Sequence, residues 1–91
     1  MILFYRGFSR FRCFDCERAL AMLPAGSRAY PVDSPNPATA VKALALMAWF
    51  ECLDDSKPVP ILVDDEAETG RFGVTPTWYG QEAIERLMVT Q

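Results

Sequence analysis

Two cysteines three positions apart, Cys13 and Cys16, follow a short apolar run at the start of the chain. Residues 2–6 favour β-structure and end at Gly7, which predicts a buried strand. After a short loop the cysteines come at the start of a helix predicted over residues 14–23. A helix start favours a thiolate, and a second thiol one turn further along can resolve a mixed disulfide. The spacing therefore indicates thiol–disulfide exchange or one half of a zinc site.

The rest of the chain offers few further metal ligands. It has no histidine and only one more cysteine, Cys52, so a tetrahedral zinc site would need a carboxylate or a second chain. The acidic stretch 64–68 lacks the spacing of a calcium loop and predicts a solvated turn. Cys52 itself is expected to be a small buried apolar residue. We therefore predict no metal site.

Composition limits the class of protein. With 91 residues, 51% of them apolar and 23% charged, the chain is expected to form a single domain over residues 1–91. A net charge of −3 argues against a general nucleic-acid binder, and no apolar run reaches the length of a membrane span. The N-terminus shows no signal-peptide pattern, and an odd cysteine count argues against a secreted disulfide framework. We expect a cytoplasmic protein without nucleic-acid or membrane partners.

Strands and helices alternate along the rest of the chain. The further elements predicted are a strand over residues 28–33, a helix over 37–53, strands over 58–63 and 70–79, and a helix over 80–88. Pro31 and Pro76 place their strands at sheet edges, because proline cannot donate to a ladder. Asn36 is the predicted cap of the second helix and Pro37 its first residue. The two strongly apolar strands are then central, in a β-α-β-α-β-β-α order.

The predicted helix over residues 37–53 is unusually apolar. From Ala38 to Leu53 its only charged residues are Lys42 and Glu51. It is either a well-buried helix with alanines on its outer side, or a surface for self-association or a partner.

The loop before the cysteines combines arginine with phenylalanine. Arg10 and Arg12 add positive charge near Cys13 and favour its thiolate, whereas Asp15 opposes it. Such a loop could grip nucleic acid, but an anion-binding or peptide-binding rim around the thiol is the simpler explanation. Phe14, next to the predicted nucleophile, is expected to belong to this rim.

In its order of elements the chain resembles the thioredoxin fold in its shortest form, and glutaredoxins in particular. The resemblance depends on the C-x-x-C pair, on Val59-Pro60 at the third strand, and on the glycine-led last helix, Gly80-Gln81-Glu82-Ala83-Ile84. It implies an α/β domain with a four-stranded mixed sheet, in the strand order 2-1-3-4, flanked by three helices. It also implies a cis peptide bond at Val59-Pro60. Pro76 could take that role, but too little chain follows it before the last helix.

The resemblance also implies how a substrate is held. Arg10 stands where glutaredoxins carry a basic residue that pairs with a glutathione carboxylate. The backbone of Val59, beside Pro60, pairs with glutathione or a peptide as an added strand, and Gln81 and Glu82 hold the other end of glutathione. The predicted catalytic residues are Cys13 and Cys16, and the predicted substrate-binding residues are Arg10, Arg12, Phe14, Val59, Pro60, Gln81 and Glu82.

These predictions favour a small thiol–disulfide oxidoreductase. It would reduce protein disulfides or glutathione mixed disulfides, with glutathione as the reductant and no tightly bound cofactor. Cys13 would be the nucleophile and Cys16 the resolving thiol. The alternative is a non-enzymatic docking or assembly module that uses the apolar helix over residues 37–53. The chain is expected to be a monomer, or a weak homodimer through that helix.

Overall fold

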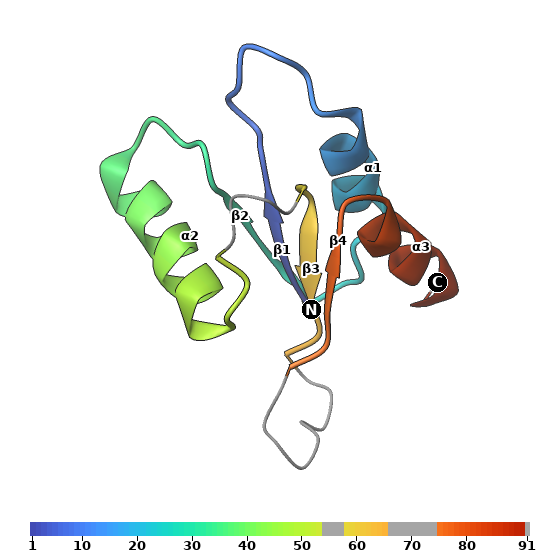
Figure 1. Cartoon of the computed structure of the whole chain (residues 1–91). Coiled ribbons are helices and arrows are strands. Elements are labelled where there is room, and N and C mark those ends of the chain that lie inside the picture. The colour runs from blue at the N-terminus through green and yellow to red at the C-terminus, as the bar shows by residue number, and fades with distance from the viewer. Residues whose placement is uncertain (54–57, 66–74, 91) are drawn as a thin grey trace.

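The computed structural model describes residues 1–53, 58–65 and 75–90, which form four strands and three helices (Figure 1). In chain order the elements are β1 (Ile2–Tyr5), α1 (Phe14–Met22), β2 (Arg28–Pro31), α2 (Pro37–Trp49), β3 (Ile61–Val63), β4 (Thr77–Tyr79) and α3 (Gln81–Thr90). The strands form one mixed sheet in the order β2-β1-β3-β4. The predicted α/β arrangement, with this strand order and three helices, is confirmed.

β1 lies inside the sheet, between a parallel and an antiparallel neighbour. Leu3 pairs with Ala29 of the parallel strand β2 and with Leu62 of the antiparallel strand β3, and β4 pairs with β3 on the outer side. Pro31 ends β2 at the edge of the sheet. The predicted central and edge strands are therefore confirmed. The strands are shorter than predicted, and residues 70–74 lie outside the described residues.

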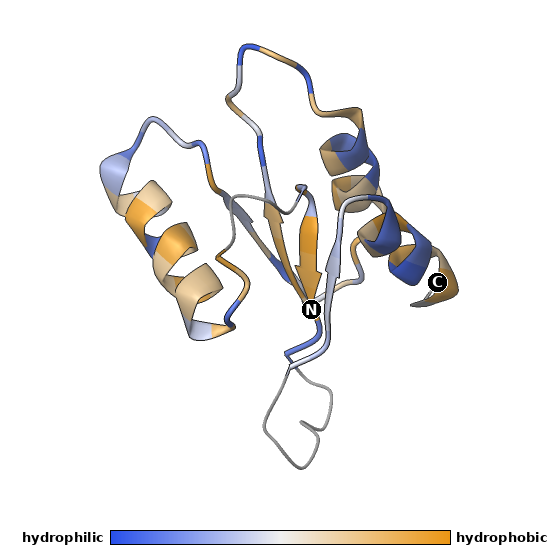
Figure 2. Ribbon diagram, viewed as in Figure 1, coloured by the Kyte–Doolittle hydropathy of each residue, from blue (hydrophilic) through white to orange (hydrophobic). Residues whose placement is uncertain are grey.

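Helices cover both faces of the two central strands. Phe4 and Ile61 are buried on the side of α2, whereas Leu3 and Leu62 are buried on the side of α1 and α3. Successive side chains of a strand point to opposite faces, so a strand covered on both sides has a continuous apolar sequence. Figure 2 shows the apolar colour along β1 and β3, between α2 on one side and the other two helices on the other.

The buried faces of α1 and α3 differ in part from the predicted ones. Cys16 and Ala19 of α1 are buried, but Leu20, which the periodicity predicts to face inward, is 39% exposed. α1 packs against α3 as well as against the sheet, so its inward face centres on Cys16 and the small Ala19. Met88 of α3 is also predicted to face inward but is 59% exposed.

α2 begins where the sequence predicts. The Asn36 side chain accepts the backbone N–H of Ala38 (3.0 Å), and Pro37 is the first helical residue. The cap satisfies an N–H that the first turn leaves unpaired, and proline has no N–H to leave unpaired. The predicted start of α2 is confirmed.

α2 is shorter than predicted and ends at Trp49. The Glu51 N–H donates to the Ala48 carbonyl (3.1 Å), and the Cys52 N–H donates to the Met47 carbonyl (2.8 Å). Glu51 has a φ of 58°, in the left-handed region. This is the Schellman pattern of helix termination, in which glycine usually takes the left-handed position. Because glutamate takes it here, the sequence gives no signal for this helix end.

Replacing Glu51 with glycine is therefore expected to leave stability unchanged or raise it by up to about 1 kcal/mol. Glycine removes the cost of a left-handed side chain, although it also raises the entropy of the unfolded chain. Glu85→Gly in the exposed interior of α3 is the matched control and should cost about 1 kcal/mol. Urea unfolding of both variants measures the difference. Equal losses in the two variants would contradict a left-handed Glu51.

The outer side of α2 is apolar and exposed. Val41, Leu44 and Trp49 are 64%, 42% and 80% exposed, whereas Ala43 and Met47 are buried. Of the two interpretations of this helix, the well-buried one is therefore wrong, because large apolar side chains as well as alanines face outward. Within the described ranges, no helix has the length and apolarity needed to cross a membrane.

Candidate active site

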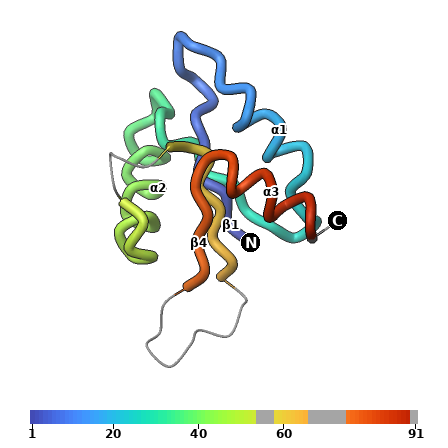
Figure 3. Tube along the Cα trace, turned by 45° about the vertical axis from the view of Figure 1, so that its right-hand side comes forward, coloured from blue at the N-terminus to red at the C-terminus, as the bar shows by residue number. Residues whose placement is uncertain are grey.

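Three segments that are far apart in the sequence meet at one end of the sheet. β1 ends there and leads into the loop before Cys13, whereas the antiparallel strand β3 begins there, directly after Pro60. β4 ends there too and leads through Gly80 into α3. Figure 3 shows the turn into β3 and the start of α3 beside each other at this end, below the loop that precedes α1. The topology thus brings the predicted site residues to the same end of the sheet.

Cys13 and Cys16 are joined by a disulfide bond, with their Cα atoms 5.2 Å apart. Cys13 is the N-cap residue of α1, and its Sγ accepts the backbone N–H of Cys16 (3.2 Å). Cys16 is only 1% exposed, whereas Cys13 is partly exposed. The sulfur of Cys13 is therefore the more accessible to a second molecule.

Backbone N–H groups lie close to both sulfur atoms. Besides the Cys16 N–H at Cys13, the Arg6 N–H donates to Cys16 Sγ (3.5 Å). Such donors and the start of a helix stabilise negative charge on sulfur. Asp15 and Glu17 in the first turn of α1 act in the opposite direction. The reduced pair would thus have hydrogen-bond donors for a thiolate already in place.

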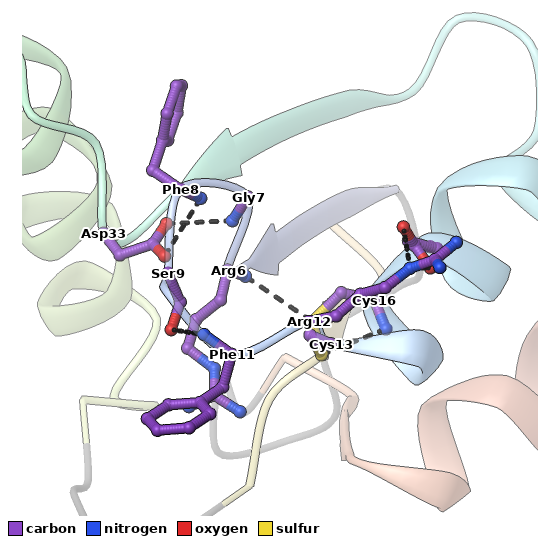
Figure 4. The surroundings of a disulfide bond; sticks show 10 residues. Arg6, Gly7, Phe8, Ser9, Phe11, Arg12, Cys13, Cys16 and Asp33 are labelled. Carbon is purple, nitrogen blue, oxygen red and sulfur yellow. Dashed lines mark hydrogen bonds and ion pairs between the residues drawn. A yellow bond between two sulfur atoms is a disulfide. The ribbon is translucent and has the colours of Figure 1, made fainter.

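Asp33 holds the loop between β1 and the cysteines. Its two carboxylate oxygens accept the backbone N–H groups of Gly7 (2.9 Å) and Phe8 (3.1 Å), and Ser9 Oγ accepts the Phe11 N–H (3.2 Å) (Figure 4). Asp33 is not among the residues that the sequence predicts for the site. It follows β2, and the carboxyl ends of parallel neighbours lie at the same edge of a sheet, so a parallel pairing of the first two strands would have pointed to it.

Arg12 is held along α1. Its guanidinium pairs with both carboxylate oxygens of Glu17 (2.9 and 3.0 Å) and lies 4.8 Å from the centre of the Phe14 ring. In Figure 4 the side chain points away from the disulfide. Glu17 therefore neutralises the positive charge of Arg12. Arg6 and Arg10, by contrast, have no ion-pair partner among the described residues.

A cavity of about 380 Å³ lies between this loop and α1. Its lining includes Arg10, Arg12, both cysteines and Leu20. The structure therefore brings two of the predicted binding residues to the same cavity as the predicted catalytic pair. Phe14, which is 64% exposed, does not line the cavity.

The Val59–Pro60 peptide bond is cis, as the resemblance implies. The Pro60 carbonyl accepts the Gly80 N–H (2.7 Å), which joins the turn before β3 to the start of α3. Gly80 has a φ of 58°, and a Cβ atom there would lie 2.8 Å from Pro58 Cγ, so the position requires glycine. The bond before Pro76, the rejected alternative, is not cis.

The remaining predicted residues form a second group on this end of the sheet. Val59 precedes the cis bond, and within the described part of the chain its backbone N–H and carbonyl make no hydrogen bond. Gln81 and Glu82 are exposed at the start of α3. None of these residues lines the cavity beside the cysteines. The predicted site is thus divided into two groups, with the disulfide in the first.

Cys52 does not belong to the site. It is fully buried on the α2 side of the sheet, with Phe4 and Met47, which confirms the prediction of a buried apolar residue. Burial raises the pKa of its thiol, and its backbone hydrogen bond only partly offsets this effect. In the described residues, no three or more His, Cys, Asp or Glu side chains gather closely enough to hold a metal ion.

No family model, curated protein or solved structure matches the chain. The chemistry available to the site therefore has to follow from its residues. An accessible thiol and a buried thiol, close enough to form a disulfide, can take up and release two electrons. The cavity beside them is large enough for a side chain or a small ligand.

Proposed function

We propose that the chain is a small thiol–disulfide oxidoreductase of the glutaredoxin type, with a thioredoxin-like fold. It reduces protein disulfides, or mixed disulfides with glutathione, through Cys13 and Cys16. The observation that carries the proposal is the unequal placement of the two thiols, with Cys13 partly exposed at the helix start and Cys16 buried within bonding distance. The strand order supports the fold assignment.

The reaction transfers two electrons from the dithiol to the substrate. The Cys13 thiolate attacks one sulfur of the substrate disulfide, whose S–S bond breaks as a Cys13–substrate disulfide forms, and the other substrate sulfur leaves as a thiolate. Cys16, after losing its proton, attacks Cys13 Sγ of this mixed disulfide. The Cys13–Cys16 bond forms and the second substrate thiolate leaves. Two molecules of glutathione then reduce the protein disulfide and become glutathione disulfide.

The surroundings of Cys13 support its role as the nucleophile. The N–H of Cys16 already points to its sulfur, and the start of α1 adds positive potential. Arg10 supplies a cation in the adjoining cavity that can pair with a substrate carboxylate. These features favour the thiolate of Cys13 and bring an anionic substrate toward it.

The second group of residues supports a place for an extended substrate. An extended peptide, or glutathione, can pair as an added strand with the backbone groups of Val59, which make no hydrogen bond to any described residue. The exposed Gln81 and Glu82 at the start of α3 would then contact its other end. A reaction fed by glutathione belongs in a reducing compartment, so we propose a cytoplasmic location.

The test is the reduction of a small disulfide coupled to glutathione, glutathione reductase and NADPH. The wild-type protein should consume NADPH well above the background without protein. A parallel assay replaces glutathione and its reductase with thioredoxin reductase. Activity only in the second assay would contradict glutathione as the reductant. No activity in either assay would contradict the proposed oxidoreductase activity.

A second candidate function is a docking or assembly module that uses α2. The specific observation is its exposed apolar face, formed by Val41, Leu44 and Trp49. Soluble proteins rarely leave such side chains together in solvent without a partner. The occupant we propose is a second copy of the chain, because the helix can pack against its own copy in a symmetric pair.

Trp49→Glu is expected to abolish any concentration-dependent dimer, because it puts a charge in place of the most exposed large apolar side chain of this face. The measurement is sedimentation velocity of wild type and variant across a wide range of protein concentration. Val89→Glu is the matched control, since Val89 is 73% exposed on α3 and away from α2. A wild type that stays monomeric at every concentration would contradict self-association.

A further inference from the structure

The cavity between the loop and α1 has a charge opposite to that of the chain as a whole. Three arginines and one glutamate line it, although the net charge of the chain is −3. Glu17 already pairs with Arg12, whereas Arg6 and Arg10, which also line the cavity, have no ion-pair partner among the described residues. Asp15 does not line it. An anionic group next to the disulfide would therefore meet the guanidinium groups of Arg6 and Arg10.

The same cavity has apolar side chains that the fold does not use. Phe8 and Phe11 are 58% and 76% exposed, and Leu20 of α1 is 39% exposed on the opposite side. Phe8 and Phe11 come from the loop and Leu20 from α1, so two separate segments supply apolar residues to the lining. In Figure 4 the rings of Phe8 and Phe11 point in different directions, both away from the disulfide. These side chains add nothing to the two buried clusters of the core. The favourable free energy of burying these side chains is obtained only when a ligand covers them.

The loop is held in place before any ligand binds. Asp33 fixes its first residues through two backbone N–H groups, and the Arg6 N–H contacts Cys16 Sγ. A loop that is already ordered loses less entropy on binding than a free one. The cavity is therefore suited to discriminate between ligands.

We propose that this cavity binds the segment of a substrate protein beside its disulfide, and selects segments in which an aromatic or aliphatic side chain stands next to a carboxylate. The inference rests on the proposed oxidoreductase function and adds its substrate class. The apolar side chain is buried against Phe11 and Leu20, and the carboxylate pairs with Arg6 or Arg10. Glutathione has carboxylates but no large apolar side chain, so it leaves the apolar lining uncovered.

The test compares three peptides that carry the same disulfide. One has a Phe-Asp pair beside the cysteine, the second has Phe-Lys, and the third has Ser-Asp. The wild-type protein should reduce the Phe-Asp peptide with a kcat/KM about 10-fold above each of the others, because both the apolar contact and the ion pair contribute. The preference over Phe-Lys should shrink as the salt concentration rises.

Two variants connect the preference to the cavity. Arg6→Gln combined with Arg10→Gln should reduce the preference for Phe-Asp over Phe-Lys to less than about 3-fold. Arg18→Gln is the matched control, because Arg18 is exposed on α1 but does not line the cavity, and it should keep the wild-type preference. A preference that survives in the double variant would overturn the assignment of the two arginines.

A small disulfide and a binding titration separate this inference from the proposed function. If the protein reduces the small disulfide but treats the three peptides alike, the substrate class is wrong and the oxidoreductase stands. The titration uses the oxidised protein and a Phe-Asp peptide without cysteine, which should bind at least about 10-fold more tightly than its Phe-Lys counterpart. Selective binding without any reduction would overturn the oxidoreductase and keep the cavity as a peptide site.

Discussion

Cys13→Ser is expected to reduce the rate of disulfide reduction by more than about 1,000-fold. Cys13 is the N-cap of α1 and the more exposed of the two bonded cysteines. A serine hydroxyl stays protonated under conditions where a thiol at a helix start ionises, and it forms no stable bond with the substrate sulfur. The measurement is the glutathione-coupled assay with a small disulfide as substrate.

Two further variants decide how the pair is used. Cys16→Ser should abolish the reduction of protein disulfides, because no thiol then resolves the mixed disulfide. Activity toward glutathione mixed disulfides in this variant would indicate a route that needs Cys13 alone. Cys52→Ala is the matched control, because Cys52 is buried on the other side of the sheet and should leave the rate unchanged. A Cys13→Ser protein as active as wild type would contradict Cys13 as the nucleophile.

The parts of the fold that could be predicted depend on strong local signals. The apolar residues of β1 and β3 are buried on both faces, and Asn36 with Pro37 is a cap that acts within one turn. Pro31 placed β2 at the edge of the sheet because a missing N–H has the same consequence in any sheet, whereas Pro76 lies just before β4. Each of these signals can be interpreted without knowing the tertiary contacts around it.

The parts that could not be predicted depend on tertiary contacts. Leu20 has the spacing of an inward residue, but the packing of α1 against α3 turns the inward face toward Ala19. α2 ends at Trp49 and is followed by a left-handed Glu51, a position where glycine would have been the signal. In both places local periodicity is overruled by contacts that only the folded chain contains.

The candidate site shows the same division. Cys13, Cys16 and the cis bond at Pro60 could be predicted, because spacing and resemblance are visible in the sequence. Asp33 was missed, although the parallel pairing of β1 and β2 brings the end of β2 to the loop that follows β1. The pairing of Arg12 with Glu17 was also missed, although the two residues are close in sequence. The sequence shows which charges are near the site, and the structure shows which of them remain free.

Phe4→Ala is expected to lower the free energy of unfolding by about 3–5 kcal/mol. Phe4 is fully buried in the central strand β1, where it packs with Met47 of α2, and its ring lies 6.1 Å from that of Tyr30. Removing the ring leaves a cavity between the sheet and α2 that the strand cannot close. A chain of 91 residues has a total stability of about 5–14 kcal/mol, so this single change brings it close to unfolding.

Phe11→Ala is the matched control for this change, because it removes the same ring from a residue that is 76% exposed on the loop after β1. It should alter the stability by no more than about 0.5 kcal/mol. Urea unfolding of the two variants and the wild type measures both effects. Since β1 leads directly into the loop before Cys13, the Phe4 variant should lose activity only to the extent that it unfolds. A loss of stability below about 1 kcal/mol on Phe4→Ala would contradict the burial of this ring between the sheet and α2.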